Sequence, residues 1–155
     1  MSRLIFFTHL SFSLLLGLIL TRFMPLEVPT IIFLGAICVS SFLPDIDNAT
    51  SFIGRRAKPV SLFLSHRQFF HSILCAIVIS LVLFNIVGVA DYAFAFLVGY
   101  GSHLFLDSFN KGGIALFWPS QIHLKGPFKT RGIFDMILFV LFTAADLVLI
   151  KSMFL

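Results

Sequence analysis

His103 and Asp107 stand four residues apart near the end of an apolar run of the chain. In a helix this spacing places both side chains on one face, about one turn apart. Imidazole nitrogen and carboxylate oxygen together suit Zn²⁺, Mn²⁺ or Fe²⁺. Ionisable residues within membrane helices are costly and by default indicate function. We therefore interpret the pair as metal ligands; the alternative is a His–Asp hydrogen bond that packs two helices.

Two further carboxylates, Asp45 and Asp47, follow Pro44 at the end of another apolar run. Proline lacks an amide proton and disfavours helix at the residue before it, so Pro44 is expected to end a helix at about residue 43. Alternate carboxylates in an extended turn can converge on one cation. A helix C-terminus disfavours anions unless a cation offsets them, which strengthens this interpretation. The alternative is a solvated Asx-type turn.

The segment SHRQFFHS, residues 65–72, contributes His66 and His71. Five residues along a regular helix separate two side chains by about 140°, so both can face one site only if His66 precedes the helix. Ser65 is a candidate N-cap, which would put His71 in the first turn. The alternative is a histidine pair at a wet interface. Arg67 is a candidate clamp for phosphate or carboxylate, or a charge that sets topology.

The elements that must position these side chains are membrane helices. Hydrophobic residues make up 59% and charged residues 12% of the 155 residues, against roughly 25% charged in soluble domains. Runs suited to membrane helices lie at about 4–23, 29–43, 69–89, 91–109 and 133–154. We expect one all-α, membrane-embedded domain over residues 1–155, a helical bundle with four to five transmembrane helices and two long loops.

The cations predict the orientation of this bundle. Nine of the eleven Lys and Arg residues fall in the N-terminal segment and in two long loops, 44–68 and 110–132, whereas Arg22 and Lys151 fall on the other side. The positive-inside rule places the N-terminus and both loops in the cytoplasm. We attribute the net charge of +4 to residues that set the orientation of the protein in the membrane. The expected partner is therefore the lipid bilayer and not nucleic acid. The sequence does not indicate an oligomeric state.

This topology brings seven potential ligands to one depth in the membrane. They are His9, Asp45, Asp47, His66, His71, His103 and Asp107. The topology was assigned from Lys and Arg alone, so the coincidence supports a metal site independently. Seven ligands exceed the three or four that a single zinc takes, so we expect one or two divalent metals, with zinc favoured over manganese or iron.

Four other titratable residues have simpler expected roles. His123 lies in a long loop and either binds substrate or is solvated. Asp91 and Asp135 begin helices, where a carboxylate is favourable. Asp146 lies in the middle of the last helix and is expected to form a packing or oligomer contact.

Several of these motifs, taken together, resemble the YdjM-like family of bacterial inner-membrane proteins. They are LPDIDN, IGRR, HRQFFHS and GYGSHLFLDSFNKGGIALFWP, and the resemblance covers residues 8–119. It implies a bacterial inner-membrane location and a metal-dependent hydrolase role for Asp45, Asp47, His66, His71, His103 and Asp107, with His9 as the N-terminal histidine. Many members carry a Glu where the last helix starts, and this chain has Asp135. The ligand order is also similar to the all-helical zinc phospholipase C and S1/P1 nuclease group, although this sequence lacks that group's later His and Glu ligands and its N-terminal Trp.

We predict metal-assisted hydrolysis at the cytoplasmic membrane face, on a phosphoester such as a phospholipid headgroup. The metal would lower the pKa of bound water, and Asp45 or Asp47 would act as general base. Arg67, Arg55 and Arg56 are expected to bind an anionic group, while Gly112, Gly113 and Trp118 border the substrate site. The alternatives are a divalent-metal transporter or sensor, and a non-catalytic protein with a structural metal. Transporters place ligands near the bilayer midplane, whereas these lie at one edge.

Overall fold

The computed structural model describes residues 3–47, 69–120, 122–128 and 132–154, with the side chains of residues 3–5, 47 and 154 outside the description. Within these ranges the fold is all-helical, as predicted. Its α-helices are α1 (Arg3–Leu20), α2 (Thr30–Ser40), α4 (Ile73–Val87), α5 (Ala90–Ser108) and α6 (Ile133–Phe154). There are also two 3-10 helices, η1 (Leu43–Asp47) and η2 (Phe69–His71).

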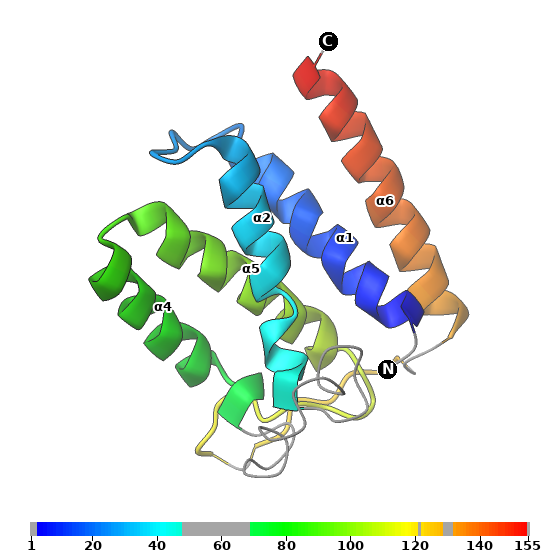
Figure 1. Cartoon of the computed structure of the whole chain (residues 1–155). Helices are drawn as coiled ribbons and strands as arrows, with labels where there is room; N and C mark the ends of the chain where they lie inside the picture. The colour runs from blue at the N-terminus through cyan, green and yellow to red at the C-terminus, as the bar shows by residue number, and fades with distance from the viewer. Residues whose placement is uncertain (1–2, 48–68, 121, 129–131, 155) are drawn as a thin grey trace.

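Helix α1 lies at the centre of the bundle and packs against α6, α2 and α5. Helix α5 in turn packs between α2 and α4. Figure 1 shows that α1 and α6 begin, α5 ends, and η1 and η2 lie at one end of the molecule, together with the described part of the loop that follows α5. The C-terminus lies at the opposite end (Figure 1). The fold thus collects the polar motifs of the sequence at a single end.

The end of α2 differs from the prediction. The helix stops at Ser40, capped at Ser41, and Pro44 lies inside η1 instead of terminating the α-helix. The amide of Asp45 donates to the carbonyl of Phe42 over 3.2 Å, which closes a 3-10 turn. Asp45 is therefore held by a short helix and not by an extended turn.

The start of α4 also differs. Ser72 is its N-cap, and the Ser72 hydroxyl accepts a hydrogen bond from the amide of Cys75 over 3.2 Å. A serine in this position satisfies an amide that the helix leaves unpaired, so the α-helix begins after it. His71 consequently lies in η2, ahead of the helix, and not in its first turn. The predicted cap, Ser65, lies outside the described residues.

Small and hydroxyl residues allow α5 to approach its neighbours closely. The Ser40 hydroxyl donates to the carbonyl of Ala95 over 3.3 Å, and the Ser80 hydroxyl donates to that of Ala93 over 2.8 Å. A Cβ built on Gly99 would lie 2.1 Å from the carbonyl oxygen of Ile37. Small residues and hydroxyl bonds of this kind are the usual means of packing helices in membranes, where hydrophobic burial between helices gains little.

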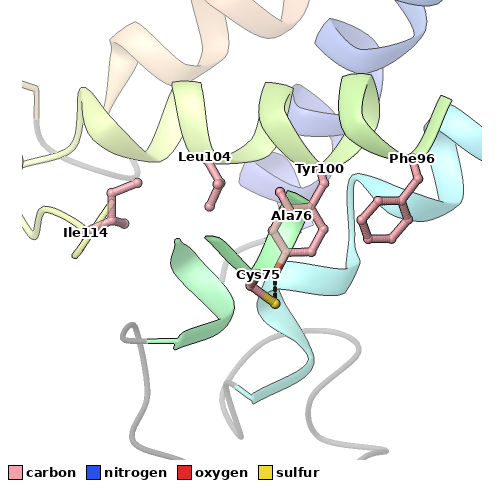
Figure 2. Packing of buried hydrophobic residues seen from close by; sticks show 6 residues of the cluster. All are labelled: Cys75, Ala76, Phe96, Tyr100, Leu104 and Ile114. Atoms are coloured by element: carbon pink, nitrogen blue, oxygen red, sulfur yellow. Dashed lines mark hydrogen bonds between the residues drawn. The ribbon is translucent and has the colours of Figure 1, made fainter. Parts of the chain in front are cut away.

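A cluster of buried, mainly apolar side chains also joins α4 and α5. It consists of Cys75, Ala76, Phe96, Tyr100, Leu104 and Ile114 (Figure 2). The Tyr100 hydroxyl lies 3.3 Å from the Cys75 sulfur and also donates to the carbonyl of Phe70. This second bond fixes η2, and with it His71, against α5.

Helix α6 is the described helix that is long and apolar enough to cross a membrane, over Ile133–Met153, and few of its residues are buried by the rest of the chain. Its contact with α1 includes a polar pair: the Ser11 hydroxyl donates to the Asp146 carboxylate over 2.6 Å. Asp146 is thus a helix-packing residue, one of the two roles expected of it.

Asp91 does more than begin a helix. Its carboxylate accepts hydrogen bonds from the amides of Glu27 and Val28, over 2.6 and 3.0 Å. It therefore fixes the turn between α1 and α2 against the start of α5. The sequence did not reveal this contact because the two segments are more than sixty residues apart.

The close approach of α2 and α5 predicts opposite effects of the same substitution at two glycines of α5. Gly99→Ala should lower the free energy of unfolding by about 1–3 kcal/mol, because the new methyl group collides with the backbone of α2. Gly101→Ala meets no atom within 4 Å and should be neutral or stabilising, because alanine favours helix by about 1 kcal/mol. Unfolding in detergent, followed by circular dichroism, measures both; equal stability of the two variants would contradict the packing described.

Candidate metal centre

Five buried side chains from four elements meet at the loop end of the bundle. His9 comes from α1, Asp45 from η1, His71 from η2, and His103 and Asp107 from α5. Each has 9% or less of its surface exposed. Five of the seven predicted ligands are therefore close together, although they are spread over almost a hundred residues of sequence.

The Asp107 carboxylate lies between the three histidines, and its two oxygens face different partners. Oδ1 is 3.2 Å from His9 Nε2 and accepts a hydrogen bond from Asn110 Nδ2 over 3.0 Å. Oδ2 is 3.7 Å from His71 Nε2 and 3.5 Å from His103 Nε2. Oδ1 thus already has donors, and Oδ2 is the oxygen directed at the other two imidazoles.

The backbone fixes the tautomer of His103. Its Nδ1 lies 2.7 Å from the carbonyl oxygen of Ser41, and because a carbonyl can only accept, Nδ1 carries the proton. In the neutral ring, Nε2 is then an unprotonated acceptor. A hydrogen bond from one ring nitrogen to a carbonyl is the usual way in which proteins orient a metal-binding histidine.

This geometry places acceptors opposite each other in a buried site. His103 Nε2 makes no hydrogen bond with the described part of the chain, yet it faces the carboxylate Oδ2 of Asp107. Two acceptors that face each other away from water are costly unless a cation or a proton lies between them. A divalent cation satisfies both atoms at once, so the residues present fit a bound metal.

Two overlapping groups have ligand atoms within 4.8 Å of one another: Asp45, His71 and His103, and His9, His103 and Asp107. His71 Nε2 is also 3.9 Å from Asp45 Oδ1. Neighbouring donors around a tetrahedral metal with bonds of about 2.1 Å are about 3.4 Å apart, close to these separations. The two groups share His103 and together contain all five side chains of the cluster, so the residues present fit one ion or two neighbouring ions.

Five of the other predicted site residues are not placed by the described structure. His66, Arg67, Arg55 and Arg56 lie outside the described residues, as does the side chain of Asp47. Their roles stay predictions. His123 is described and exposed, as expected of a solvated loop residue.

Gly113 and Trp118 of the second loop each make contacts within the protein. Gly113 has a φ of 65°, and a Cβ there would lie 2.7 Å from the carbonyl oxygen of Leu124. The close approach that Gly113 permits is therefore to its own loop, where Ile114 and Leu124 exchange backbone hydrogen bonds. Trp118 packs edge-on against Phe69, with ring centroids 5.2 Å apart. Contact of Gly112, Gly113 or Trp118 with a substrate stays a prediction.

Two contributors to the site were missed from the sequence. Asn110 follows Asp107 by three residues, a spacing that could have suggested their hydrogen bond. Ser41 acts through its backbone carbonyl, which leaves no signal in the sequence.

Comparison with known proteins places this chain among membrane proteins. The model of the family described as YdjM inner membrane protein matches residues 4–154. The chain is 32% identical over 93 residues to the uncharacterized protein YvsG of Bacillus subtilis (strain 168), an alignment that covers 57% of this chain and 58% of that protein. It is 31% identical over 98 residues to the inner membrane protein YdjM of Escherichia coli (strain K12), covering 57% of this chain and 50% of that protein. The chain thus spans about half the length of these curated relatives, and no solved structure matches it.

The geometry of His103 predicts which histidines control metal content. His103→Ala should lower the metal bound per protein at least about tenfold, since even supporting residues of metal sites contribute 10–100-fold to affinity. His123→Ala is the matched control, because His123 is exposed and outside the cluster, and it should keep wild-type metal. Elemental analysis of purified, folded protein measures the ratio. Equal metal content in both variants would show that the cluster binds no metal.

Proposed function

The chain belongs to the YdjM inner membrane protein family, and on this premise we propose that it is a metal-dependent hydrolase acting at the cytoplasmic face of the membrane. The family match agrees with the resemblance drawn from the sequence motifs. The observation that carries the proposal is the convergence of His9, Asp45, His71, His103 and Asp107 at one end of the bundle.

The proposed bundle crosses the membrane four to five times. Helix α6 has the length and hydropathy of a full span, and shorter apolar helices lie at Phe6–Leu20, Thr30–Ile46 and Ile73–Val87. Helices α4 and α6 expose many large apolar side chains, for example Leu81 at 56% and Val148 at 67%. Such broad apolar exposure suits contact with lipid, which is the partner we propose.

The cluster lies at the end of the bundle that the charges assign to the cytoplasm. Figure 1 shows the described part of the loop after α5 at this end, and the sequences of the two long loops hold most of the Lys and Arg residues. A position at the end of the bundle favours an enzyme over a transporter, because transporters hold their ions near the midplane.

We propose that the substrate is a phosphoester. In the membrane, the headgroup of a phospholipid would supply this phosphoester. When bound, a divalent metal, with zinc favoured over manganese or iron, would supply Lewis-acid activation of water and of the scissile group. Asp45, which would bind the metal through one carboxylate oxygen, would accept a proton from the attacking water through the other, with Asp47 as the other candidate base. As the water oxygen bonds to phosphorus, the ester P–O bond breaks, and the leaving alkoxide oxygen takes up a proton.

A structural metal is the second candidate function. Its support is the ligand set itself: His71, His103, Asp45 and Asp107 would complete a four-coordinate shell, and structural zinc sites are closed in this way. The four residues come from three elements, η1, η2 and α5, so an ion there would also hold these elements together.

The proposed orientation predicts opposite labelling of two introduced cysteines. Cys38 and Cys75 are first replaced by alanine. In intact cells, a membrane-impermeant maleimide should then label Glu27→Cys, in the exposed turn between α1 and α2, because this turn lies outside the cytoplasm. His123→Cys should react only after the membrane is permeabilised. The reverse pattern would invert the bundle and place the cluster at the outer face.

The proposed hydrolysis predicts that Asp45→Asn lowers the turnover of bis(p-nitrophenyl) phosphate and of phosphatidylglycerol vesicles by about 10²–10⁴, the usual contribution of a general base. Metal content should fall far less than in His103→Ala, because the side-chain oxygen of the introduced asparagine can still bind the metal. Glu27→Gln, an exposed acid at the other end, is the control. Wild-type turnover in Asp45→Asn would exclude Asp45 as the base. Metal-loaded wild type that hydrolyses neither compound would favour the structural metal.

A further inference from the structure

An apolar cavity of about 200 Å³ lies beside the metal cluster, between α1, α5 and α6. Its walls are mainly aromatic and aliphatic and include Phe12, Phe105, Leu106, Phe134, Leu138 and Phe142. Phe12 stacks on Phe105 with ring centroids 5.9 Å apart and contacts Phe142 at 4.9 Å. The cavity thus has the lining of a site for an apolar ligand.

Four polar residues, Thr8, His9, Asn110 and Asp135, also line this cavity, and two of them contact the cluster. His9 and Asn110 line the cavity, and both hydrogen bond to Oδ1 of Asp107. The cavity therefore ends one side chain away from the proposed metal ligand Asp107. A ligand that fills it would have its end beside the cluster.

His9 also has a second ring nitrogen that could bond to a ligand. Its Nε2 faces the carboxylate of Asp107, so it is the donor, and Nδ1 of the neutral ring is an acceptor. His9 is 4% exposed, and Nδ1 has no hydrogen-bond partner within the described part of the chain. A buried acceptor of this kind suits a hydroxyl or another donor supplied by a ligand.

Part of the cavity wall is exposed at the apolar surface of the molecule. Three of its lining residues are partly or largely exposed: Phe105 at 54%, Phe109 at 40% and Phe134 at 36%. Phe134 belongs to α6, the helix that has the length and hydropathy of a membrane span. In a membrane, a ligand with an apolar tail can therefore enter from the lipid.

We infer that this cavity binds the hydrocarbon chain of a membrane lipid and holds the lipid's headgroup at His9 and Asn110, next to the metal cluster. The inference rests on the proposed hydrolase function and narrows its substrate class to phosphoesters that carry an alkyl or acyl chain. The size of the cavity agrees with this, because a cavity of about 150 Å³ admits a benzene molecule. It accommodates a segment of one chain, whereas the rest of the lipid stays in the bilayer.

A larger apolar cavity elsewhere in the bundle does not have these properties. It measures about 600 Å³ and lies between α1, α2 and α6, lined by residues such as Leu18, Cys38 and Ile150. Its lining includes no member of the metal cluster. The juxtaposition of an apolar wall with His9 and Asn110 is what distinguishes the smaller cavity.

The test fills the cavity from two walls and leaves the cluster unchanged. Leu138→Trp on α6 and Leu106→Trp on α5 each place an indole in the cavity, and Leu147→Trp, at a position 64% exposed on α6, is the matched control. Native mass spectrometry in a steroid-based detergent, which has no flexible alkyl chain to compete, measures binding of myristoyl lysophosphatidylglycerol. Wild type and Leu147→Trp should bind one lipid saturably, and both cavity variants should bind it at least about tenfold more weakly. Metal content should be equal in all four proteins.

Two results would overturn the inference. One is unchanged lipid affinity in both cavity variants, and the other is equal affinity of wild type for glycerophosphoglycerol, which has the same headgroup without a chain. Kinetics separate this inference from the proposed function. Both cavity variants should lose kcat/KM for the lysolipid and keep it for glycerophosphoglycerol. If metal-loaded wild type binds the lysolipid but hydrolyses neither compound, the hydrolase proposal fails and the chain-binding cavity stands.

Discussion

The burial of the Asp107 carboxylate among three imidazoles is the constraint on which the rest of this structure depends. A buried charge is costly unless opposite charge and hydrogen bonds compensate for it. His9 and Asn110 supply donors to one oxygen, while the other oxygen faces His71 and His103. The Ser41 carbonyl holds the proton of the neutral His103 ring at Nδ1, so Nε2 of His103 and Oδ2 of Asp107 face each other as two acceptors. A divalent metal bound between them would resolve this conflict, as would an additional proton.

The rest of the fold holds these side chains at one end of the bundle. Gly99, Ala95 and Ser40 let α2 approach α5 closely enough for the carbonyl of Ser41 to reach His103. Tyr100 fixes η2 against α5 through the carbonyl of Phe70, and this places His71. Helix α6 packs on α1 through Ser11 and Asp146 and completes the cavity beside His9. Packing contacts distant from the cluster thus determine its geometry.

Much of this arrangement was predictable from sequence because the relevant signals are strong. Long apolar runs located the helices within a few residues, and the spacing of His103 and Asp107 placed them on one face of α5. The incorrect predictions concern the end of α2 and the start of α4, where local hydrogen bonds determine the structure. The cap at Ser72 excludes His71 from α4, and the turn closed by Asp45 places Pro44 inside a 3-10 helix. Contacts between distant segments were not predictable: the backbone carbonyl of Ser41 and the pairing of Asp91 with the turn after α1 depend on packing that no local pattern records.

We expect His71, His103, Asp45 and Asp107 to hold a divalent metal in the purified protein. An anomalous-difference map from crystals of the protein, purified without chelators, would locate such an ion. We expect a peak among these four side chains, within about 2.0–2.2 Å of their nitrogen and oxygen atoms. Well-ordered crystals with no peak among them, or with a peak only at another position, would contradict the account.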